Sequence, residues 1–477
     1  MHRTLQGEDK MTGSMWKGVA VLLLCAAISF GWSYEFVRSA KGAIQMIDFG
    51  AIYYGAQCEI HHIDPYGPGG ALREFRSEGG RFLTDPFALR TDPITLSVGV
   101  NLPTALVLTV PLALLPWGVA QTLWMVLTAG LLALGAALMW DLGAKAAPAI
   151  WICLAGFLLA NTEGLLASGN LSGVAVGLCV VGVWGILSER YALAGVLLLA
   201  ISLVLKPHDS GFIWLYFLLA GGTLRKRALQ TLAITCVLGL IAVIWIAPTS
   251  PHWIAELHKN LTFMSGRGGL NDPGPHGLTN RVIAQIISMQ AALSVLWDNP
   301  RFYNPASYLI IGSLIMLWAL GALRKRTSPH SAPLALAAIS ALSLLPVYHR
   351  TYDAKLLLLT LPACAILWTE GGARRWIALA LTSAGILVTS DLPLVFLLSS
   401  TKNLSISTAT LSDKVASVLL FRPAPLVLLA LGCFYLWVFL LYNPPQPSLL
   451  SAEDARTAAD AKRPVVMLQD REVIGRW

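Results

Sequence analysis

The amino-acid sequence predicts an all-α polytopic membrane protein. Of its 477 residues, 56% are hydrophobic and only 13% are charged, and the mean hydropathy is +0.64. Soluble domains usually carry about 25% charged residues. The apolar segments are continuous, without the alternation of membrane β-strands. Because backbone groups in lipid need partners within their own segment, each segment is expected to be a helix.

The apolar segments and the charges between them predict how the chain crosses the membrane. Lys/Arg clusters at 225–227, 324–326 and 374–375, with the basic N-terminus, predict cytoplasmic loops. The segments between these loops would then face the other side. The apolar segments lie at 16–37, 95–115, 118–140, 148–167, 171–187, 191–205, 208–223, 228–247, 304–323, 333–347, 355–369, 376–398 and 423–442.

Thirteen spans would place the two termini on opposite sides, whereas the charges place both in the cytoplasm. We therefore expect about twelve transmembrane helices, with one broken or re-entrant piece before Arg225. A single transmembrane domain over 1–442 would carry extracytoplasmic loops at 38–94 and 249–303, and a mobile cytoplasmic tail would follow at 443–477. The first segment could be a secretory signal, but its length and the spans after it favour an uncleaved helix.

The net charge of +8 is explained by the cytoplasmic loops, so we expect no nucleic-acid partner. The sequence has neither a P-loop nor a Rossmann glycine pattern, and we expect no cofactor. Six of the seven cysteines lie in apolar segments, with no CxxC pair, and we expect no metal site. An enzyme of this kind would need a substrate that is already activated.

Polar residues gather in the first loop, where residues 44–66 read IQMIDFGAIYYGAQCEIHHIDPY. A solvated loop with interfacial tyrosines would explain this composition. Alternatively, Asp48 is a carboxylate at the membrane surface that deprotonates an acceptor hydroxyl while a lipid-linked donor stays in the bilayer. His61 and His62 are neighbours in sequence, which disfavours their binding one metal ion from a helix.

Asp48-Phe49 with Tyr53-Tyr54 after the first helix, and then Asp64-Pro65-Tyr66, resemble glycosyltransferase family 87. Its members are polyprenol-phosphate-mannose-dependent mannosyltransferases with the GT-C membrane fold. The resemblance implies a GT-C-like bundle with a large first extracytoplasmic loop, and it assigns Asp48 as the catalytic base. It also implies substrate binding at the tyrosines of this loop, at Asp64, and at Asn170 within SGNLSG (168–173).

Two further polar clusters interrupt apolar surroundings. LVLKPHDSGF (203–212) contains Lys206 and His208, and PVYHRTYDAKLLLL (346–359) contains four further candidates. Each could be a plain turn, with Lys206 snorkelling to lipid headgroups. Charges at this depth are costly and often functional. We predict that Lys206, His208 and Arg350 bind the donor phosphate and that His349, Tyr352 and Asp353 bind substrate.

The sequence therefore predicts a glycosyltransferase that moves a sugar, expected to be mannose, from a polyprenyl-phosphate donor to an extracytoplasmic glycolipid or glycan hydroxyl. Its expected partners are the donor, the acceptor and the bilayer, and its expected location is the cytoplasmic membrane with the active site on the outer face. A multi-span transporter is the main alternative, but no related halves are visible in the sequence. A polysaccharide polymerase or ligase and a structural component are further alternatives.

Overall fold

The computed structural model describes residues 2–39, 43–84, 88–275, 277, 285–325, 327–392 and 410–441. Within these residues the secondary structure is helical, apart from two isolated bridges, Ala43 to Arg81 and Ile286 to Arg350. The predicted all-α class is confirmed. The tail predicted at 443–477 lies outside the described residues, so it is not considered further.

Seven helical segments of the described chain are long and apolar enough to cross a membrane. They lie in α1 (His2–Ser39), α6 (Trp117–Leu138), α7 (Pro148–Ala160) with α8 (Glu163–Ser168), α12 (Gly222–Ile246), α15 (Pro300–Arg324), the 3₁₀ helix η4 (Thr351–Thr360) with α17 (Leu361–Glu370), and α21 (Pro423–Leu441). The chain is a multi-pass membrane protein.

The sequence predicts about twelve spans, but the described chain has only seven helices long enough to cross a membrane, or eight with one bent pair. The pair α9 (Leu171–Leu187) and α10 (Ala192–Leu205) would add an eighth span, but it is bent by 119°. Other apolar segments form helices well short of the ~20 residues that cross a bilayer. These are α5 (Pro103–Ala113), α11 (Pro207–Ala220) and α16 (Ser331–Leu342).

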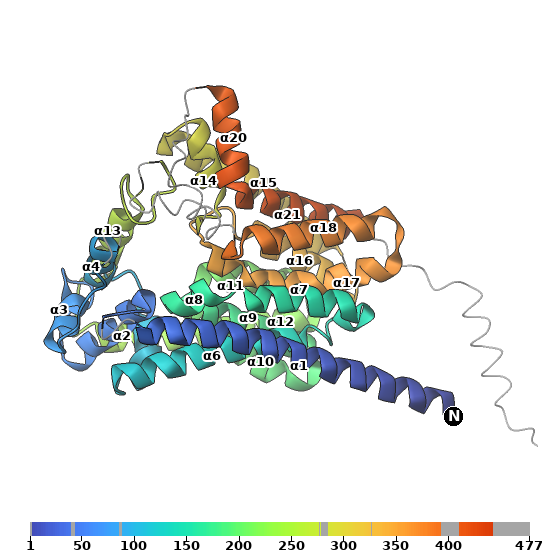
Figure 1. The fold of residues 1–477 in the computed structure, drawn as a ribbon, viewed down its shortest axis with the longest axis horizontal. Helices are drawn as coiled ribbons and strands as arrows, with labels where there is room; N and C mark the ends of the chain where they lie inside the picture. The colour runs from blue at the N-terminus through green and yellow to red at the C-terminus, as the bar shows by residue number, and fades with distance from the viewer. Residues whose placement is uncertain are drawn as a thin grey trace, which may run out of the picture. The chain divides into compact units, whose positions relative to one another are not determined.

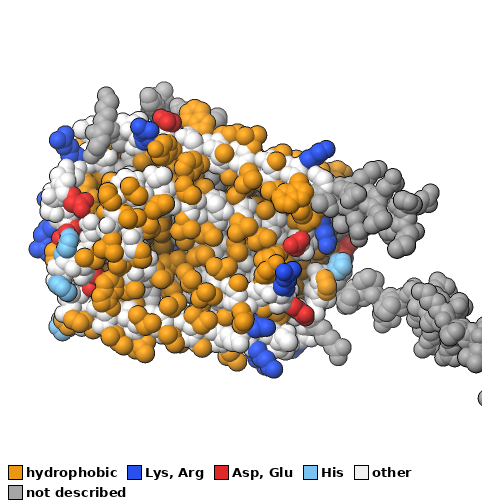
Figure 2. Space-filling view, turned by 90° about the horizontal axis from the view of Figure 1, so that it is seen from below, with side chains coloured by type: hydrophobic (Ala, Val, Ile, Leu, Met, Phe, Trp, Pro, Cys, Tyr) orange, Lys and Arg blue, Asp and Glu red, His pale blue; other side chains and the backbone are white. Residues whose placement is uncertain are grey.

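The apolar surface of these helices is consistent with a lipid environment. Figure 2 shows hydrophobic side chains spread over the broad middle of one face, with charged side chains toward its two ends. Exposed apolar residues are frequent on α12, including Leu240 (60%) and Ile244 (64%). A soluble monomer rarely exposes a patch of this size, whereas a transmembrane bundle needs one.

The first large loop is itself helical. It contains α2 (Ile47–Ile60), α3 (Gly70–Ser77) and α4 (Ala88–Ser97), which pack on one another and are drawn at the left of the view in Figure 1. An aromatic cluster anchors α2, because Phe49 stacks on Trp124 with ring centroids 4.8 Å apart and on Trp117 at 5.5 Å. This packing fixes the start of α2 against the helix bundle.

Helix α9 runs through the core and is buried along nearly its whole length. It packs on α6, α10 and η4. Glycines allow the close crossing with α10, since a Cβ on Gly185 would lie 2.8 Å from the Cα of Gly195. The N-terminus of α9 therefore occupies a fixed position in the middle of the bundle.

The remaining helices are two short 3₁₀ turns in the first half of the chain and four helices in the second half. These elements are η1 (Ala144–Ala146), η2 (Glu189–Tyr191), α13 (Trp253–Ser265), α14 (Met289–Leu296), α18 (Gly372–Val388) and α20 (Leu411–Phe421). In its described residues, the predicted loop at 249–303 contains α13, α14 and the start of α15. Residues 276 and 278–284 of this loop lie outside the described residues.

Candidate active site

Asp48 stands in the first turn of α2 and is half-buried. The helix begins after Met46, whose backbone is left-handed (φ 56°). The Met46 amide donates to the carbonyl oxygen of Ala167 at 3.1 Å, which ties the start of α2 to the end of α8. The carboxylate is thus placed next to the α8–α9 turn, which is 120 residues further along the chain.

Asn170 connects Asp48 to the core helix. It is the N-cap of α9, and its Oδ1 accepts from the amide of Ser172 at 3.0 Å, as N-cap residues do. Its Nδ2 donates to Oδ2 of Asp48 at 2.8 Å. Because the cap occupies the amide oxygen, the amino group must face the carboxylate. The described residues place no hydrogen-bond donor on the other oxygen, Oδ1 of Asp48.

Gly169 makes this contact geometrically possible. It ends α8 in the left-handed region (φ 66°), where other residues are strained. A Cβ here would lie 2.7 Å from Cβ of Phe49 and 2.9 Å from Cε of Met46. The Trp124 indole donates to the Gly169 carbonyl oxygen at 3.0 Å. The α8–α9 turn and the start of α2 are therefore in direct contact at this glycine.

Lys206 lies between α10 and α11 and joins this cluster from the other side. Its Nζ is 2.5 Å from Oδ1 of Asp353 and 3.4 Å from Oδ2 of Asp209, and it also contacts the Ser172 hydroxyl. Both carboxylates are 1% exposed. Ser172 also contacts Oδ1 of Asp353. The chain Asp48–Asn170–Ser172–Lys206 therefore links two of the predicted site segments through polar contacts.

The third segment enters through η4. The amide of Arg350 donates to Oδ2 of Asp353 at 2.7 Å. The Arg350 guanidinium contacts the Tyr348 hydroxyl and lies 3.4 Å from Oδ1 of Asn271. The fold thus brings three distant segments, which carry Asp48, Lys206 and Arg350, into one region. The roles of these residues stay predictions.

Three other predicted residues also lie in this region. The ring of Tyr352 faces Lys206, whose Nζ is 5.5 Å from its centroid. The rings of His208 and His349 meet edge to face at 5.0 Å, and both point toward Asp209. His349 is fully buried.

The first-loop tyrosines bond elsewhere. Tyr53 donates to the carbonyl oxygen of Leu115 at 2.7 Å, and Tyr54 donates to Glu78 at 3.3 Å. Both rings are buried in the aromatic cluster around Trp117. These contacts hold α2 in place, and the substrate-binding role of Tyr53 and Tyr54 stays a prediction.

Asp64 and Tyr66 shape the loop after α2. Asp64 Oδ1 accepts from the Tyr66 amide at 2.9 Å and from the Ser250 hydroxyl at 2.5 Å. The Tyr66 hydroxyl donates to the Asn101 carbonyl oxygen at 2.7 Å. None of their hydrogen bonds involves Asp48, so their role in substrate binding also stays a prediction.

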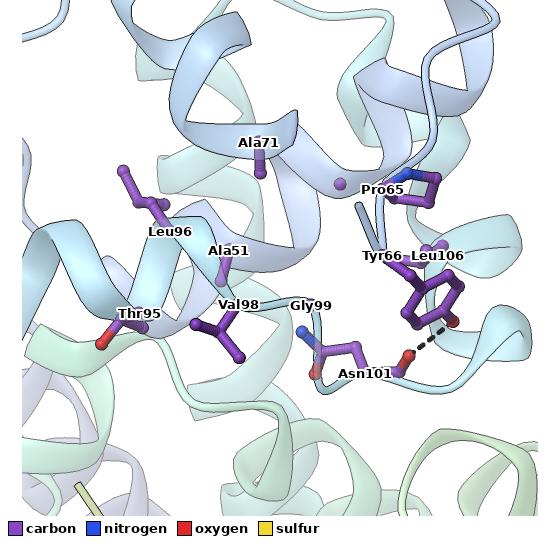
Figure 3. Close-up of a pocket in the computed structure, with 11 residues that line it drawn as sticks. Ala51, Pro65, Tyr66, Ala71, Thr95, Leu96, Val98, Gly99, Asn101 and Leu106 are labelled. Carbon is purple, nitrogen blue, oxygen red and sulfur yellow. Dashed lines mark hydrogen bonds between the residues drawn. The ribbon is translucent and has the colours of Figure 1, made fainter. Parts of the chain in front are cut away.

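Tyr66 lines a small cavity between α2, α3, α4 and α5 (Figure 3). The space open to the centre of a water molecule is about 10 Å³, of the order of a single water. Its lining does not include Asp48 or Lys206. The cavity is too small for a sugar ring and is best described as a packing gap.

Sequence reasoning left two residues of the cluster out of the predicted site, Ser172 and Asp209. Ser172 follows Asn170 by two positions, the spacing at which a capped helix amide lies close to the cap. Asp209 follows His208 directly at the start of α11. Ser172 and Asp209 could have been predicted as site residues, because a buried polar side chain needs a hydrogen-bond partner and each lies next to a predicted site residue.

The charges of the cluster do not balance. Lys206 and Arg350 carry two positive charges, whereas Asp48, Asp209 and Asp353 carry three negative charges when ionised. With neutral histidines the sum is one negative charge. The net charge of the cluster therefore does not favour the binding of an anionic substrate.

A model of glycosyltransferase family 87 matches residues 101–348. The chain belongs to glycosyltransferase family 87. The predicted family is thereby confirmed, and the protein is a membrane glycosyltransferase. The searches of curated proteins and of solved structures return no match.

The family 87 match covers part of the cluster. Asn170, Lys206 and His208 lie inside the matched residues, whereas Asp48 precedes them and Asp353 follows them. The contacts of Asn170 with Asp48 and of Lys206 with Asp353 connect these flanking segments to the matched part.

Proposed function

We propose that this protein transfers a sugar from a polyprenyl-phosphate donor to a hydroxyl of a glycolipid or glycan on the outer face of the cytoplasmic membrane. The resemblance in the first loop favours mannose as the sugar. The observation that carries the proposal is the position of Asp48. It is a half-buried carboxylate, oriented by Asn170 and linked by polar contacts to cationic residues from two other segments.

In the proposed reaction Asp48 is the general base. The acceptor hydroxyl lies within hydrogen-bond reach of its free Oδ1 and gives up its proton as the oxygen attacks the anomeric carbon. The bond from that carbon to the phosphate oxygen breaks on the opposite face, so the configuration inverts. The leaving group is a polyprenyl phosphate, which takes the electron pair without needing a general acid.

The proposed donor-phosphate residues are Lys206, His208 and Arg350. Arg350 offers a planar fork of donors suited to phosphate oxygens. The ammonium group of Lys206 is held between the carboxylates of Asp209 and Asp353. Because its position is fixed, we propose that it orients the donor phosphate as well as attracting it. His349, Tyr352 and Asp353 surround these cations and are proposed to define the sugar side of the site. Preorganised charges of this kind stabilise charge that develops in the transition state.

The test is an assay of isolated membranes with labelled polyprenyl-phosphate mannose. Wild-type membranes should form a labelled, organic-extractable or polymer-bound product, and Asp48→Asn should reduce the rate by about 10²–10⁴-fold. Glu189→Gln changes an exposed acid in η2 and should leave the rate unchanged. Unchanged transfer by Asp48→Asn would remove the base assignment. Absence of transfer by wild type with any polyprenyl-phosphate sugar would overturn the donor class.

A further inference from the structure

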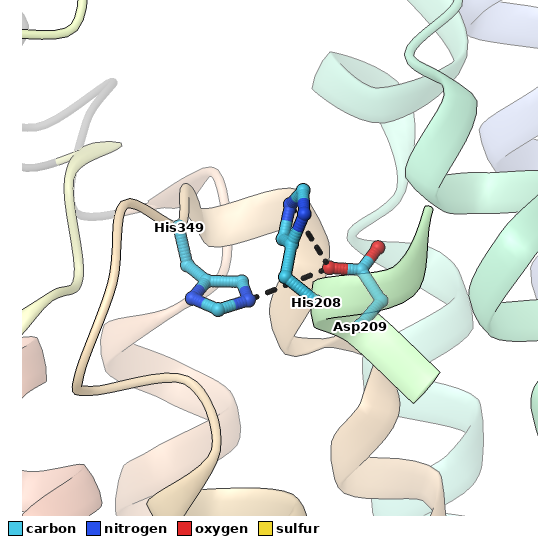
Figure 4. A group of neighbouring side chains, drawn as sticks. All are labelled: His208, Asp209 and His349. Atoms are coloured by element: carbon cyan, nitrogen blue, oxygen red, sulfur yellow. Dashed lines mark ion pairs between the residues drawn. The ribbon is translucent and has the colours of Figure 1, made fainter. Parts of the chain in front are cut away.

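Three side chains beside the cationic residues form a separate, compact group. His208 and Asp209 stand at the start of α11, and His349 precedes η4 (Figure 4). One ligand atom from each lies within 4.8 Å of the other two. Asp209 is 1% exposed and His349 is fully buried. The group brings together two imidazoles and one carboxylate, a donor set typical of metal centres in proteins.

The hydrogen bonding of His349 indicates what its second nitrogen can do. Its Nδ1 lies 3.1 Å from the carbonyl oxygen of Val347, which can only accept, so Nδ1 carries the hydrogen. In a neutral imidazole Nε2 is then an unprotonated acceptor. This Nε2 is buried, has no hydrogen-bond partner among the described residues, and faces Oδ1 of Asp209 at 3.5 Å. Metal-binding histidines are usually oriented by such a bond from their other nitrogen.

Two acceptors that face each other in a buried site need a positive centre between them. Within the described part of the chain, the two oxygens of Asp209 are also buried without hydrogen-bond partners. The two oxygens have different neighbours. Oδ2 is 3.4 Å from Nζ of Lys206. Oδ1 faces the two imidazoles, at 3.6 Å from Nε2 of His208 and 3.5 Å from Nε2 of His349. Oδ1 is therefore the oxygen that remains for a cation.

Two of the three separations between ligand atoms are close to those around a tetrahedral metal, and the third, between the two imidazoles, lies within 4.8 Å. Zinc bonds of about 2.0–2.1 Å in tetrahedral geometry separate neighbouring ligand atoms by about 3.3–3.4 Å. The 3.5 and 3.6 Å separations at Oδ1 of Asp209 are close to this value. We propose that His208, Asp209 and His349 bind one divalent transition-metal ion of the zinc class. The sequence alone predicts no metal, because the three residues come together only in the fold.

A three-residue set leaves a fourth coordination position for another ligand. Resting on the proposed function, we assign this position to a phosphate oxygen of the donor. A divalent ion would change the charge sum of the cluster from one negative to one positive, which favours an anionic substrate. The metal would then act beside Lys206 and Arg350 on the phosphate, and the proton transfer to Asp48 would not involve it.

The first test measures metal binding without an activity assay. The full chain, purified in detergent through a tag without histidines, should contain about one zinc per chain by elemental analysis. After chelation, added Co²⁺ should give the visible absorption bands of a tetrahedral centre. Asp209→Asn and His349→Asn should each lose these bands and lower zinc affinity at least tenfold. His258→Ala removes an exposed histidine of α13 and should change neither.

Failure of the variants to fold does not prevent the test, because the wild-type protein carries the decisive measurement. Wild-type protein that contains no zinc and gives no Co²⁺ bands would overturn the metal site. That result would leave a protonated His349 paired with Asp209 as the explanation of the geometry. Equal zinc affinity in His349→Asn and wild type would overturn it as well.

A second arm separates the metal site from the proposed reaction. Asp48→Asn should reduce the rate of sugar transfer by about 10²–10⁴-fold and retain both zinc and the Co²⁺ bands. A short-chain polyprenyl phosphate, added to the Co²⁺-loaded wild-type protein, should shift the bands, whereas the parent polyprenol should not. Bands that stay fixed with the phosphate would overturn its coordination while the metal site itself stands.

Discussion

Asn170 donates a hydrogen bond from Nδ2 to Oδ2 of Asp48 at 2.8 Å across 122 positions of sequence. The same asparagine caps α9, the buried central helix. The orientation of the carboxylate is therefore coupled to a helix end that cannot shift without disturbing the core. The arrangement leaves the second oxygen of Asp48 available for an acceptor hydroxyl.

The first prediction concerns this hydrogen bond. Asn170→Ala should lower kcat by up to about 10²-fold, because the carboxylate loses its fixed orientation. KM for the acceptor should change little, since Asn170 acts through Asp48. Asn170→Asp should be more severe, because it places a second carboxylate against the first. Steady-state kinetics on purified protein separate the two constants. A rise in KM with unchanged kcat would contradict the positioning role.

The second prediction concerns Gly169. Gly169→Ala should destabilise the protein by about 1–2 kcal/mol from the left-handed backbone alone. The new methyl would also push α2 away at Phe49, so transfer should fall together with stability. Gly239→Ala is the matched control, because its Cβ would meet nothing within 4 Å in the middle of α12. Thermal unfolding in detergent and the transfer assay should both distinguish the two variants.

The membrane class and the family could be predicted from sequence for clear physical reasons. Continuous apolar segments allow only helices in lipid, and the few charged residues among them had to be paired or functional. Lys206 and Arg350 stood out on this ground. In the structure Lys206 contacts Ser172 and Asp353, the Arg350 amide donates to Asp353, and Asn170 joins this group to Asp48.

Helix length and side-chain partners could not be read from hydropathy. The apolar run at 171–205 looks like two spans, yet it forms two helices bent by 119° around close glycine contacts. Tyr53 and Tyr54 belong to the motif that resembles the family, and the partners of their hydroxyls, Leu115 and Glu78, could not be predicted from that motif. Such hydrogen-bond partners come from distant parts of the chain, and the hydrophobic periodicity of a sequence does not show which distant segments lie close together.

The third prediction concerns the buried cation between two carboxylates. Lys206→Met should destabilise the protein by about 3–5 kcal/mol, because it removes the cation that the buried Asp353 shares with Asp209. Adding Asp353→Asn should recover part of this loss, since it removes one uncompensated charge. Lys259→Met is the control, because its pair with Glu256 is exposed and should contribute less than about 1 kcal/mol. Denaturant unfolding in detergent gives the comparison.

A loss in Lys206→Met no larger than in Lys259→Met would show that the buried ion pairs contribute little. A double variant that is less stable than Lys206→Met would contradict the charge explanation. In that case the packing of the lysine stem on Tyr352 would be the better explanation of its contribution.

The last prediction concerns the pH dependence of the first loop. Burial raises the pKa of Glu59 on α2 from 4.5 to about 7, although Thr249 donates to its Oε2 at 2.6 Å and thereby lowers it. In the unfolded chain this carboxyl ionises near its ordinary pKa. Between about pH 4.5 and 7 the unfolded state therefore binds fewer protons than the folded state. The contribution of Glu59 to stability must fall as pH rises through this window and level off above it.

Glu59→Gln keeps a neutral group of the same size and should remove this contribution. Its melting temperature in detergent should match that of wild type near pH 4.5 and exceed it above pH 7. Glu189→Gln, which changes an exposed acid, should follow the wild-type curve throughout. A constant difference between Glu59→Gln and wild type across the pH range would contradict the raised pKa. The whole effect would then come from the lost or altered hydrogen bond with Thr249.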